Sequence, residues 1–558
     1  EAIRLGEQVA DAVCWARDLV NEAPVDCTPE RLARAAREVA KAWRSRTDRG
    51  PVARATGPQA ADSSSAWYEA LRLSPDRLLL AFDAGPDGPR DRLVVAGVVR
   101  DETAATLAPD VRLHRLTPTD AIVAFERADP DLLLVETGAF GAGRPWAYAG
   151  EAAGLERDRR LLELLAIAHR MGRPAVLWWT AAAPIPIGIR NLEPRFDLVV
   201  AEEPVDGAPA WAVGVQFARF HDLGAPAVRE AAPLYVGAWD LRQDPRGRAA
   251  VERLLTAAAA HGLAIRVDAR AVDGPGAFPA RLRPCLDASI RLEDAGPAYR
   301  HHALVLGDGR AGGGGRVRAL EAAACGASVL VLGDRLDDDP EEALIVAGAT
   351  APEAALAAAL ALPARDASSQ RRLARRLFVE RATPVALAGL VARAGLRVDA
   401  LAGRRVTATV VGGRDLDEGR LVEDILGQVQ RPDHLIVGTP TGDALGSPAR
   451  AALDAAGVEV AAVRLTEADG ASSPNDWQAL ARATRTAWLA PWSTGAPHPA
   501  HHLLDLLLAA ESTRTATAIV TSGSAGGGPV SRGRSLVRPA VLADDLPPTF
   551  VAAAALEA

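Results

Sequence analysis

Two short apolar runs, joined by four glycines and a helical stretch, constrain the fold of this chain most strongly. Residues 303–307 and 327–332 are each short enough for a buried strand, and residues 316–325 between them have the pattern of a helix. The glycines at 312–315 allow main-chain N–H groups to approach a ligand closely. Gly326 stands where a helix is expected to end. The sequence therefore predicts a strand, a glycine loop, a helix and a second strand.

The start of this predicted helix has the chemistry of an anion site. The helix follows the glycines directly, so its free main-chain N–H groups and the positive end of its dipole face the loop. Arg316 and Arg318 add two cations to the same turn. We expect an anion such as a nucleotide diphosphate to bind here. The same residues also allow an ordinary crossover between two strands with a plain surface loop.

A similar alternation of strand-like and helix-like segments extends over much of the chain. The strand-like runs are 77–82, 92–99, 131–135, 174–180, 196–200, 233–239 and 263–267. This alternation predicts an α/β fold, in which parallel sheets carry helices on both faces. Ligands bind such sheets at the carboxyl ends of the strands. Glu136 follows one strand and is the predicted catalytic base, and Gly237 ends another, where it would let a ligand approach the main chain.

The glycine-loop stretch resembles the donor-binding half of GT-B glycosyltransferases, in particular the spore-maturation-protein-like branch (CgeB-like, group 1). In that family an arginine, a glutamate three residues later and a Cys-Gly pair lie against the sugar nucleotide. Arg318, Glu321, Cys325 and Gly326 fill these places here. The resemblance extends more weakly over residues 75–395.

This resemblance implies two Rossmann-like domains, chemistry that needs no metal ion, and a glutamate that holds hydroxyl groups of the ribose or of the sugar. It also implies that the long helical tail at 371–395 crosses back onto the first domain. The residues expected to contact the donor are Gly237, Gly315, Arg316, Arg318 and Glu321.

A different pattern begins at residue 403. Strand-like runs occupy 406–411, 432–438 and 487–490, and a helical stretch covers 417–430. Together with a Q-x-x-x-P pattern at 428–432, these segments resemble the opening of a family 2, GT-A glycosyltransferase.

The acids that such a GT-A domain uses for its metal are missing from the matching places. Gly-Thr-Pro at 438–440 and Pro-Trp-Ser at 491–493 stand where the family has carboxylates. Mg²⁺ and Mn²⁺ need hard oxygen ligands of this kind. We therefore predict a degenerate GT-A-like domain that serves packing, acceptor binding or dimer formation.

The histidines offer two weaker candidate sites. His498, His501 and His502 would share nearly one face if their segment were helical, which could bind a metal, although no nearby cysteine supports it. His301 and His302 precede a predicted strand near the donor site, where a donor contact competes with a plain role at the start of the strand.

Near the N-terminus the chain reads ARDLVNEAP at 16–24 and TPERLA at 28–33. These segments resemble the part of leucyl aminopeptidases that leads into their catalytic domain, over about 45 residues. That family needs a lysine and several acids on two metal ions, but Lys41 is the only lysine of the chain. The predicted organisation is a helical N-terminal segment (1–48), a linker (49–75), a GT-B N-terminal acceptor domain (76–230), a GT-B C-terminal donor domain (231–398) and a degenerate GT-A-like domain (403–545).

Composition excludes several classes of function. The net charge of −8 argues against a broad nucleic-acid surface. The four cysteines lack the spacing of a zinc site or a disulfide framework. No apolar run reaches the roughly 18–20 residues of a membrane span, and no signal-peptide pattern precedes the first predicted helix. We expect a cytoplasmic protein with no cofactor.

The sequence thus predicts a glycosyltransferase that moves a sugar from a nucleotide-sugar donor to a saccharide or protein acceptor without a metal. Two alternatives stay open. In the first, both sugar-transfer folds have lost their activity and the chain is a scaffold. In the second, the N-terminal resemblance marks an aminopeptidase-related protein. A homo-oligomer is also left open.

Overall fold

The computed structural model describes residues 92–520, with gaps, together with 535–537 and 550–552. The gaps within 92–520 are 142, 181–186, 203–207, 238, 240–244, 269–274, 292–293, 308–314, 334–342, 349, 364, 413–415, 444, 466–473, 493–497 and 514–517. The predicted N-terminal segment, the linker, the strand at 77–82 and most of the glycine loop lie outside the described residues.

The first sheet is parallel, with the strand order β2-β1-β3-β4-β5. Its strands are β1 (Val94–Val98), β2 (Arg112–Arg115), β3 (Leu132–Glu136), β4 (Ala175–Trp179) and β5 (Leu198–Ala201). The helices around it are α5 (Asp101–Leu107), α6 (Ala121–Ala128), α7 (Leu155–Arg170) and α8 (Ile187–Leu192).

The pleat of β3 explains how both faces of this sheet are covered. Successive side chains of a strand point to opposite faces. Leu133 and Val135 join a core with α6 and α7, whereas Leu132 and Leu134 join another with α5. A continuous apolar run is therefore what a strand buried on both sides requires.

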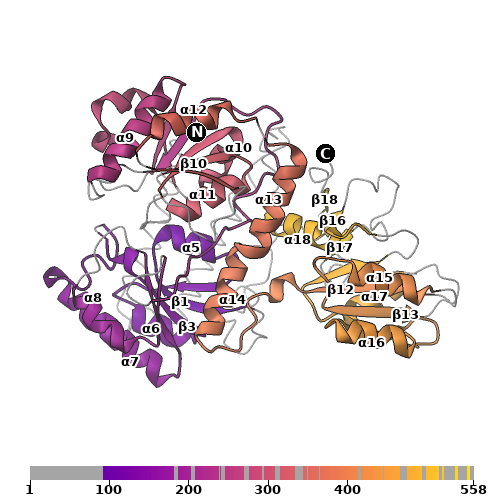
Figure 1. Cartoon of the computed structure of the whole chain (residues 1–558). Coiled ribbons are helices and arrows are strands. Elements are labelled where there is room, and N and C mark those ends of the chain that lie inside the picture. Colours follow the sequence, from indigo (N-terminus) through magenta and orange to yellow (C-terminus); the bar gives the residue numbers. More distant parts are fainter. Residues whose placement is uncertain are drawn as a thin grey trace, which may run out of the picture. The chain divides into compact units, whose positions relative to one another are not determined.

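The second sheet is also parallel, with the order β11-β10-β9-β6-β7-β8. Its strands are β6 (Leu234–Gly237), β7 (Ala264–Asp268), β8 (Leu286–Ile290), β9 (Leu304–Gly307), β10 (Ser328–Leu332) and β11 (Leu344–Ala347). Its helices are α9 (Pro245–Ala259), α10 (Ala295–His301), α11 (Gly315–Ala324) and α12 (Pro352–Ala361). One face packs on α9 and α12 and the other on α10 and α11, as Figure 1 shows. The predicted α/β fold with two Rossmann-like domains is confirmed.

The predicted helical tail is two helices rather than one, α13 (Ala367–Glu380) and α14 (Thr383–Arg393). The break falls at Ala382, which is extended, because Pro384 in the next turn has no N–H to continue the helical bonds. Leu387 and Leu390 of α14 lie in the core of the first sheet, and the indole N–H of Trp211 donates to the Ala386 carbonyl at 2.8 Å. The tail therefore packs on the first domain, as expected.

The third sheet has the order β14-β13-β12-β15-β17-β16-β18, in which only β17 runs antiparallel to its described neighbours. Its strands are β12 (Val406–Val411), β13 (His434–Thr439), β14 (Glu459–Arg464), β15 (Trp488–Pro491), β16 (Ala518–Val520), β17 (Ser535–Val537) and β18 (Phe550–Ala552). Its helices are α15 (Glu418–Leu426), α16 (Ser447–Ala455), α17 (Pro474–Ala483) and α18 (His502–Ser512). In the described part of the chain, no helix combines the length and the apolar character that a membrane crossing requires.

Candidate functional site

The order of the second sheet creates a switch point between β6 and β9. From β6 the chain proceeds to β7 and β8 on one side, then returns to β9 and continues to β10 and β11 on the other. Where a parallel sheet reverses its order in this way, a crevice opens outside the carboxyl ends of the two central strands. These ends are Gly237 of β6 and Gly307 of β9.

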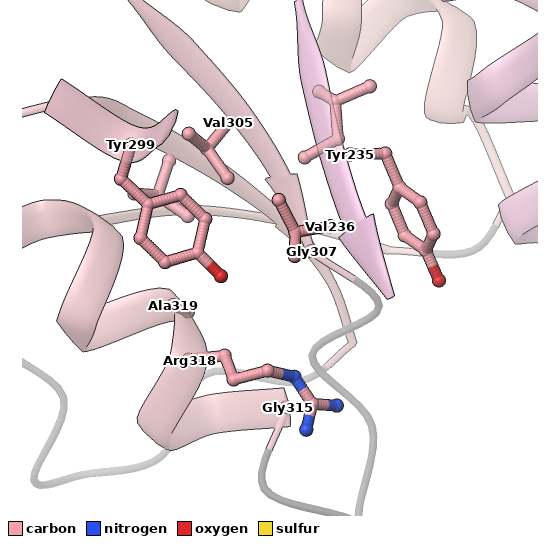
Figure 2. Close-up of a pocket in the computed structure, with 10 residues that line it drawn as sticks. Tyr235, Val236, Tyr299, Val305, Gly307, Gly315, Arg318 and Ala319 are labelled. Carbon is pink, nitrogen blue, oxygen red and sulfur yellow. The ribbon is translucent and has the colours of Figure 1, made fainter. Parts of the chain in front are cut away.

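A small pocket lies at this switch point (Figure 2). It is lined by residues from β6, β9, β10, α10 and α11, namely Tyr235, Val236, Tyr299, Val305, Leu306, Gly307, Gly315, Arg318, Ala319 and Val329. It encloses about 20 Å³, which is room for roughly one water molecule or hydroxyl group. The described residues thus outline a narrow polar recess beside the start of α11.

Helix α11 brings its N-terminus and a cation to this recess. Gly315 is its first residue and lines the pocket together with Arg318, one turn later. Arg316 lies in the same first turn but is not among the lining residues. The free N–H groups at a helix start and a nearby guanidinium are suited to a phosphate.

The other end of α11 is fixed by a hydrogen-bonded stop. Gly326 has a φ of +86°, its N–H donates to the Ala323 carbonyl, and the N–H of Ala327 donates to the Ala322 carbonyl. These two bonds form the Schellman arrangement that ends a helix at a glycine. The predicted helix end at Gly326 is confirmed.

Glu321 is buried on the next turn of α11, with 7% of its surface exposed. Burial raises the pKa of its carboxyl to about 8, although Arg318 and Arg219 act in the opposite direction. At neutral pH the group is therefore mostly a neutral acid in the unliganded protein. Burial therefore outweighs the two arginines in setting the charge of Glu321.

Gly237 ends β6 beside Tyr235. A Cβ atom at this glycine would lie 3.1 Å from the Tyr235 hydroxyl oxygen, closer than most side chains tolerate. The absence of a side chain thus keeps the end of β6 clear. His302, by contrast, lies at the amino end of β9, where its Nδ1 is 3.0 Å from the Ala232 carbonyl oxygen. This is the opposite edge of the sheet from the pocket, so a donor contact by His302 is not supported.

Glu136 lies at the corresponding switch point of the first sheet, where β1 and β3 are neighbours with β2 beyond β1. Its side chain is fully buried. One carboxylate oxygen accepts the main-chain N–H of Arg100 at 2.9 Å, and the other pairs with the Arg100 guanidinium. Burial lowers the pKa of Arg100, but the nearby carboxylates, Glu136 foremost, raise it by more, so the net pKa is raised above its ordinary value. Both oxygens of Glu136 are therefore engaged, and its role as a base stays a prediction.

An aromatic and acidic cluster lies next to the carboxyl end of β15 in the third sheet. Asp424 of α15 accepts the indole N–H of Trp492 at 2.9 Å, and its Oδ2 lies 2.6 Å from Nδ1 of His498. The rings of Trp492 and His498 are 4.2 Å apart at their centroids. His501 caps α18 and only His502 lies inside it, so the three histidines do not share a helix face. Within the described ranges, no three His, Cys, Asp or Glu side chains are grouped to hold a metal ion.

The structure brings Gly315 and Arg318 together in the pocket, places Gly237 at the end of β6 and Glu321 further along α11, and leaves Glu136 on another sheet. It also adds Tyr235, Tyr299 and Arg219, which the sequence analysis did not select. Tyr235 lies in β6, the strand that ends at Gly237. Because the sequence analysis had already selected this strand end, Tyr235 could have been predicted from its position. Tyr299 and Arg219 come from segments without a motif, and only the folded chain places them beside α11.

No family model matches the chain, and no curated protein matches it. Solved structures give distant likenesses. AviGT4, a glycosyltransferase involved in avilamycin A biosynthesis, is 15% identical over 55% of this chain and 97% of its own, with a TM-score of 0.35. The glycotransferase of kitacinnamycin is 14% identical over 54% and 99%, with a TM-score of 0.29. A UDP-N-acetylglucosamine 2-epimerase is 12% identical over 52% and 96%, with a TM-score of 0.24.

Proposed function

We propose that this protein is a glycosyltransferase that binds a nucleotide-sugar donor at the second sheet and transfers the sugar to a saccharide or protein acceptor. The observation that carries the proposal is the meeting of a helix N-terminus and Arg318 at the switch point between β6 and β9, with buried Glu321 within electrostatic range of Arg318 on the same helix. A ligand with a diphosphate at one end and hydroxyl groups beside it matches this set of groups. The resemblance of Arg318, Glu321, Cys325 and Gly326 to the GT-B pattern supports the same assignment.

The residues of α11 would assist the departure of the diphosphate. In the reaction, the bond between the anomeric carbon and the diphosphate oxygen breaks, and the diphosphate keeps the electron pair. The acceptor oxygen forms the new bond to that carbon, and its proton passes to a base. N–H groups at the start of α11 and the guanidinium of Arg318 would stabilise the negative charge that develops on the leaving group. Such stabilisation requires no metal ion.

The acceptor and the base would come from the first domain, as in the GT-B arrangement that we propose for the first two domains. Glu136 remains the proposed base. Its bonds to Arg100 would have to loosen before it could take a proton from an acceptor. The third domain, a degenerate GT-A-like domain in this proposal, would contribute packing, acceptor binding or dimer formation, since Asp424 beside the end of β15 is already engaged by Trp492 and His498.

Titration calorimetry of the full chain with UDP, GDP and TDP tests the donor site. We expect one or more of them to bind, with the same affinity in excess EDTA. Arg318→Ala should weaken this binding by about tenfold or more, since a hydrogen bond to a charged group contributes about 1.5–3 kcal/mol.

The matched control is Arg253→Ala, on an exposed part of α9, which should leave the affinity unchanged. Binding that disappears with EDTA and returns with Mn²⁺ would contradict the metal-independent mechanism. If none of the three nucleotides bound, the scaffold alternative would be favoured over the enzyme.

A further inference from the structure

Tyr299 is the most deeply buried polar side chain of the pocket that no part of the site yet uses. It lies near the end of α10 and is 2% exposed. Figure 2 shows its hydroxyl pointing toward α11 near Ala319, whereas Tyr235 points to the other side of β6. Tyr299 lines the pocket, so its hydroxyl can reach a group that occupies the recess (Figure 2). A tyrosine hydroxyl can both donate and accept a hydrogen bond there.

The position of this side chain is set by its surroundings. The Arg229 guanidinium donates to the Tyr299 main-chain carbonyl at 3.4 Å and to the Cys325 carbonyl at 3.0 Å, which ties α10 to the end of α11. The ring packs beside Phe220, with centroids 6.2 Å apart. Because the ring is covered, only the hydroxyl end of Tyr299 is offered to the pocket, and stacking on a nucleobase is not available to it.

The charges around the hydroxyl indicate what it faces. Burial raises the pKa of Tyr299, the carboxyl of Glu321 raises it as well, and Arg318 lowers it. The hydroxyl therefore lies within electrostatic range of both Glu321 and Arg318. A tyrosine hydroxyl both donates and accepts hydrogen bonds, and so does a neutral carboxylic acid. Glu321 is in that form at neutral pH, with a pKa of about 8.

The site thus has a cationic end and a neutral polar part. Gly315 and Arg318 provide the cationic end for a phosphate, and Glu321 follows Gly315 by about 9 Å along the helix at 1.5 Å per residue. The recess of about 20 Å³ takes one hydroxyl group and is too small for a phosphate or a base. Tyr299 and Arg318 line the same recess, so a hydroxyl bound in it belongs to a part of the ligand next to the phosphate, such as a sugar ring.

We infer that Tyr299 is a specificity-determining residue of this site, whose hydroxyl forms a hydrogen bond with a ring hydroxyl of the bound sugar nucleotide. This inference rests on the proposed donor site, and it adds a residue and a chemical group to it. The ring hydroxyl belongs either to the ribose of the nucleotide or to the transferred sugar. Both sources share one chemistry, and the experiment separates them.

The test is titration calorimetry of the full chain, wild type and Tyr299→Phe, with UDP, GDP and TDP, then with the 2′-deoxy form of the ribonucleotide that binds and with its UDP-glucose or GDP-mannose counterpart. Phenylalanine keeps the packing and removes only the hydroxyl. We expect Tyr299→Phe to weaken the hydroxyl-bearing ligand by about three- to tenfold, the range for a neutral hydrogen bond. Tyr148→Phe, at a partly exposed tyrosine of the first domain, is the control and should change nothing.

The pattern of losses identifies the source of the hydroxyl. If wild type loses affinity for the 2′-deoxy nucleotide and Tyr299→Phe binds both forms equally, the partner is the ribose. If the loss appears only with the nucleotide sugar, the partner is the transferred sugar. Equal affinities of wild type and Tyr299→Phe for every ligand overturn this inference and leave the proposed function intact. Failure of wild type to bind any of the nucleotides or nucleotide sugars overturns both.

Discussion

At the scale of single residues, Glu321 shows how burial changes the chemistry that a sequence suggests. The glutamate lies three residues after Arg318, a spacing that puts both on one side of a helix. That spacing alone favours a charged pair. The fold buries the carboxyl at 7% exposure and raises its pKa to about 8. The group therefore resembles a hydrogen-bonding neutral acid more than an anion until a ligand or a higher pH changes it.

This raised pKa makes stability depend on pH. The folded protein binds the proton of Glu321 more tightly than the unfolded chain, whose glutamates titrate near 4.5. The stabilisation is fully present below about pH 4.5 and is lost as the pH rises toward 8. Glu321→Gln should remove this loss, so its advantage over wild type should grow by on the order of 1 kcal/mol per pH unit across that window.

Urea unfolding at pH 5, 6.5 and 8 measures the effect. Glu353→Gln is the control, because the side chain of Glu353 is about half exposed (49%). A constant difference between Glu321→Gln and wild type at all three pH values would mean that Glu321 is not buried as a neutral acid in solution.

At the scale of elements, the end of α11 fixes the helix that carries the site. Gly326 combines a φ of +86° with a steric limit, since a Cβ atom there would lie 2.3 Å from Nη2 of Arg229. Gly326→Ala should therefore strain the main chain by about 1–2 kcal/mol and displace the Arg229 guanidinium from the Cys325 carbonyl, at about 1 kcal/mol more.

Gly395→Ala separates these two contributions. Gly395 also has a positive φ, of +70°, but nothing lies within 4 Å of its Cβ position. We expect Gly326→Ala to lower the free energy of unfolding by about 2–3 kcal/mol and Gly395→Ala by only the main-chain part. Equal losses in denaturant titrations would show that Arg229 imposes no steric limit.

The elements also show which strands a sequence pattern can predict and which it cannot. Runs such as Leu132–Glu136 and Ser328–Leu332 are buried on both faces of a sheet, so their continuous apolar character identifies them as strands. β2, with no residue fully buried, and β8, which is largely exposed, lack that signal and were not predicted. Tyr299 and Arg219 were missed for another reason. Arg219 is far from α11 in the sequence, and Tyr299 lies on α10 rather than on α11, so no local pattern encodes their meeting with Glu321 and Arg318.

At the scale of the whole molecule, α13 connects the second and third sheets. Arg375 of α13 forms two hydrogen bonds with Asp505 of α18, at 2.7 and 2.6 Å. Arg404 donates to Glu511 at 2.9 Å and lies 3.8 Å from the ring centroid of Phe378. One hydrophobic core joins α13 to both sheets. Among the described residues, neither the two cores of the first sheet nor the core between the second sheet and α9 and α12 contains a residue of the third sheet.

This distribution of cores predicts what removal of the third domain does. Residues 1–398 keep both faces of the first sheet, the outer face of the second and the α11 site, so the shortened chain should fold. It should bind the same nucleoside diphosphate within about threefold of the full chain, a difference of less than 1 kcal/mol.

Removal of the third domain also exposes Phe378, which is 2% exposed in the full chain, and leaves Arg375 without its carboxylate. The melting temperature should therefore fall, and the shortened chain should associate through the exposed face of α13. Asp505→Ala in the full chain breaks only the ion pair, and we expect it to lower stability less while leaving monomer content and nucleotide affinity unchanged. Calorimetric melting, light scattering and nucleotide titration of the full chain, the shortened chain and Asp505→Ala test these expectations. If the shortened chain is unfolded, the second domain requires the third in order to fold.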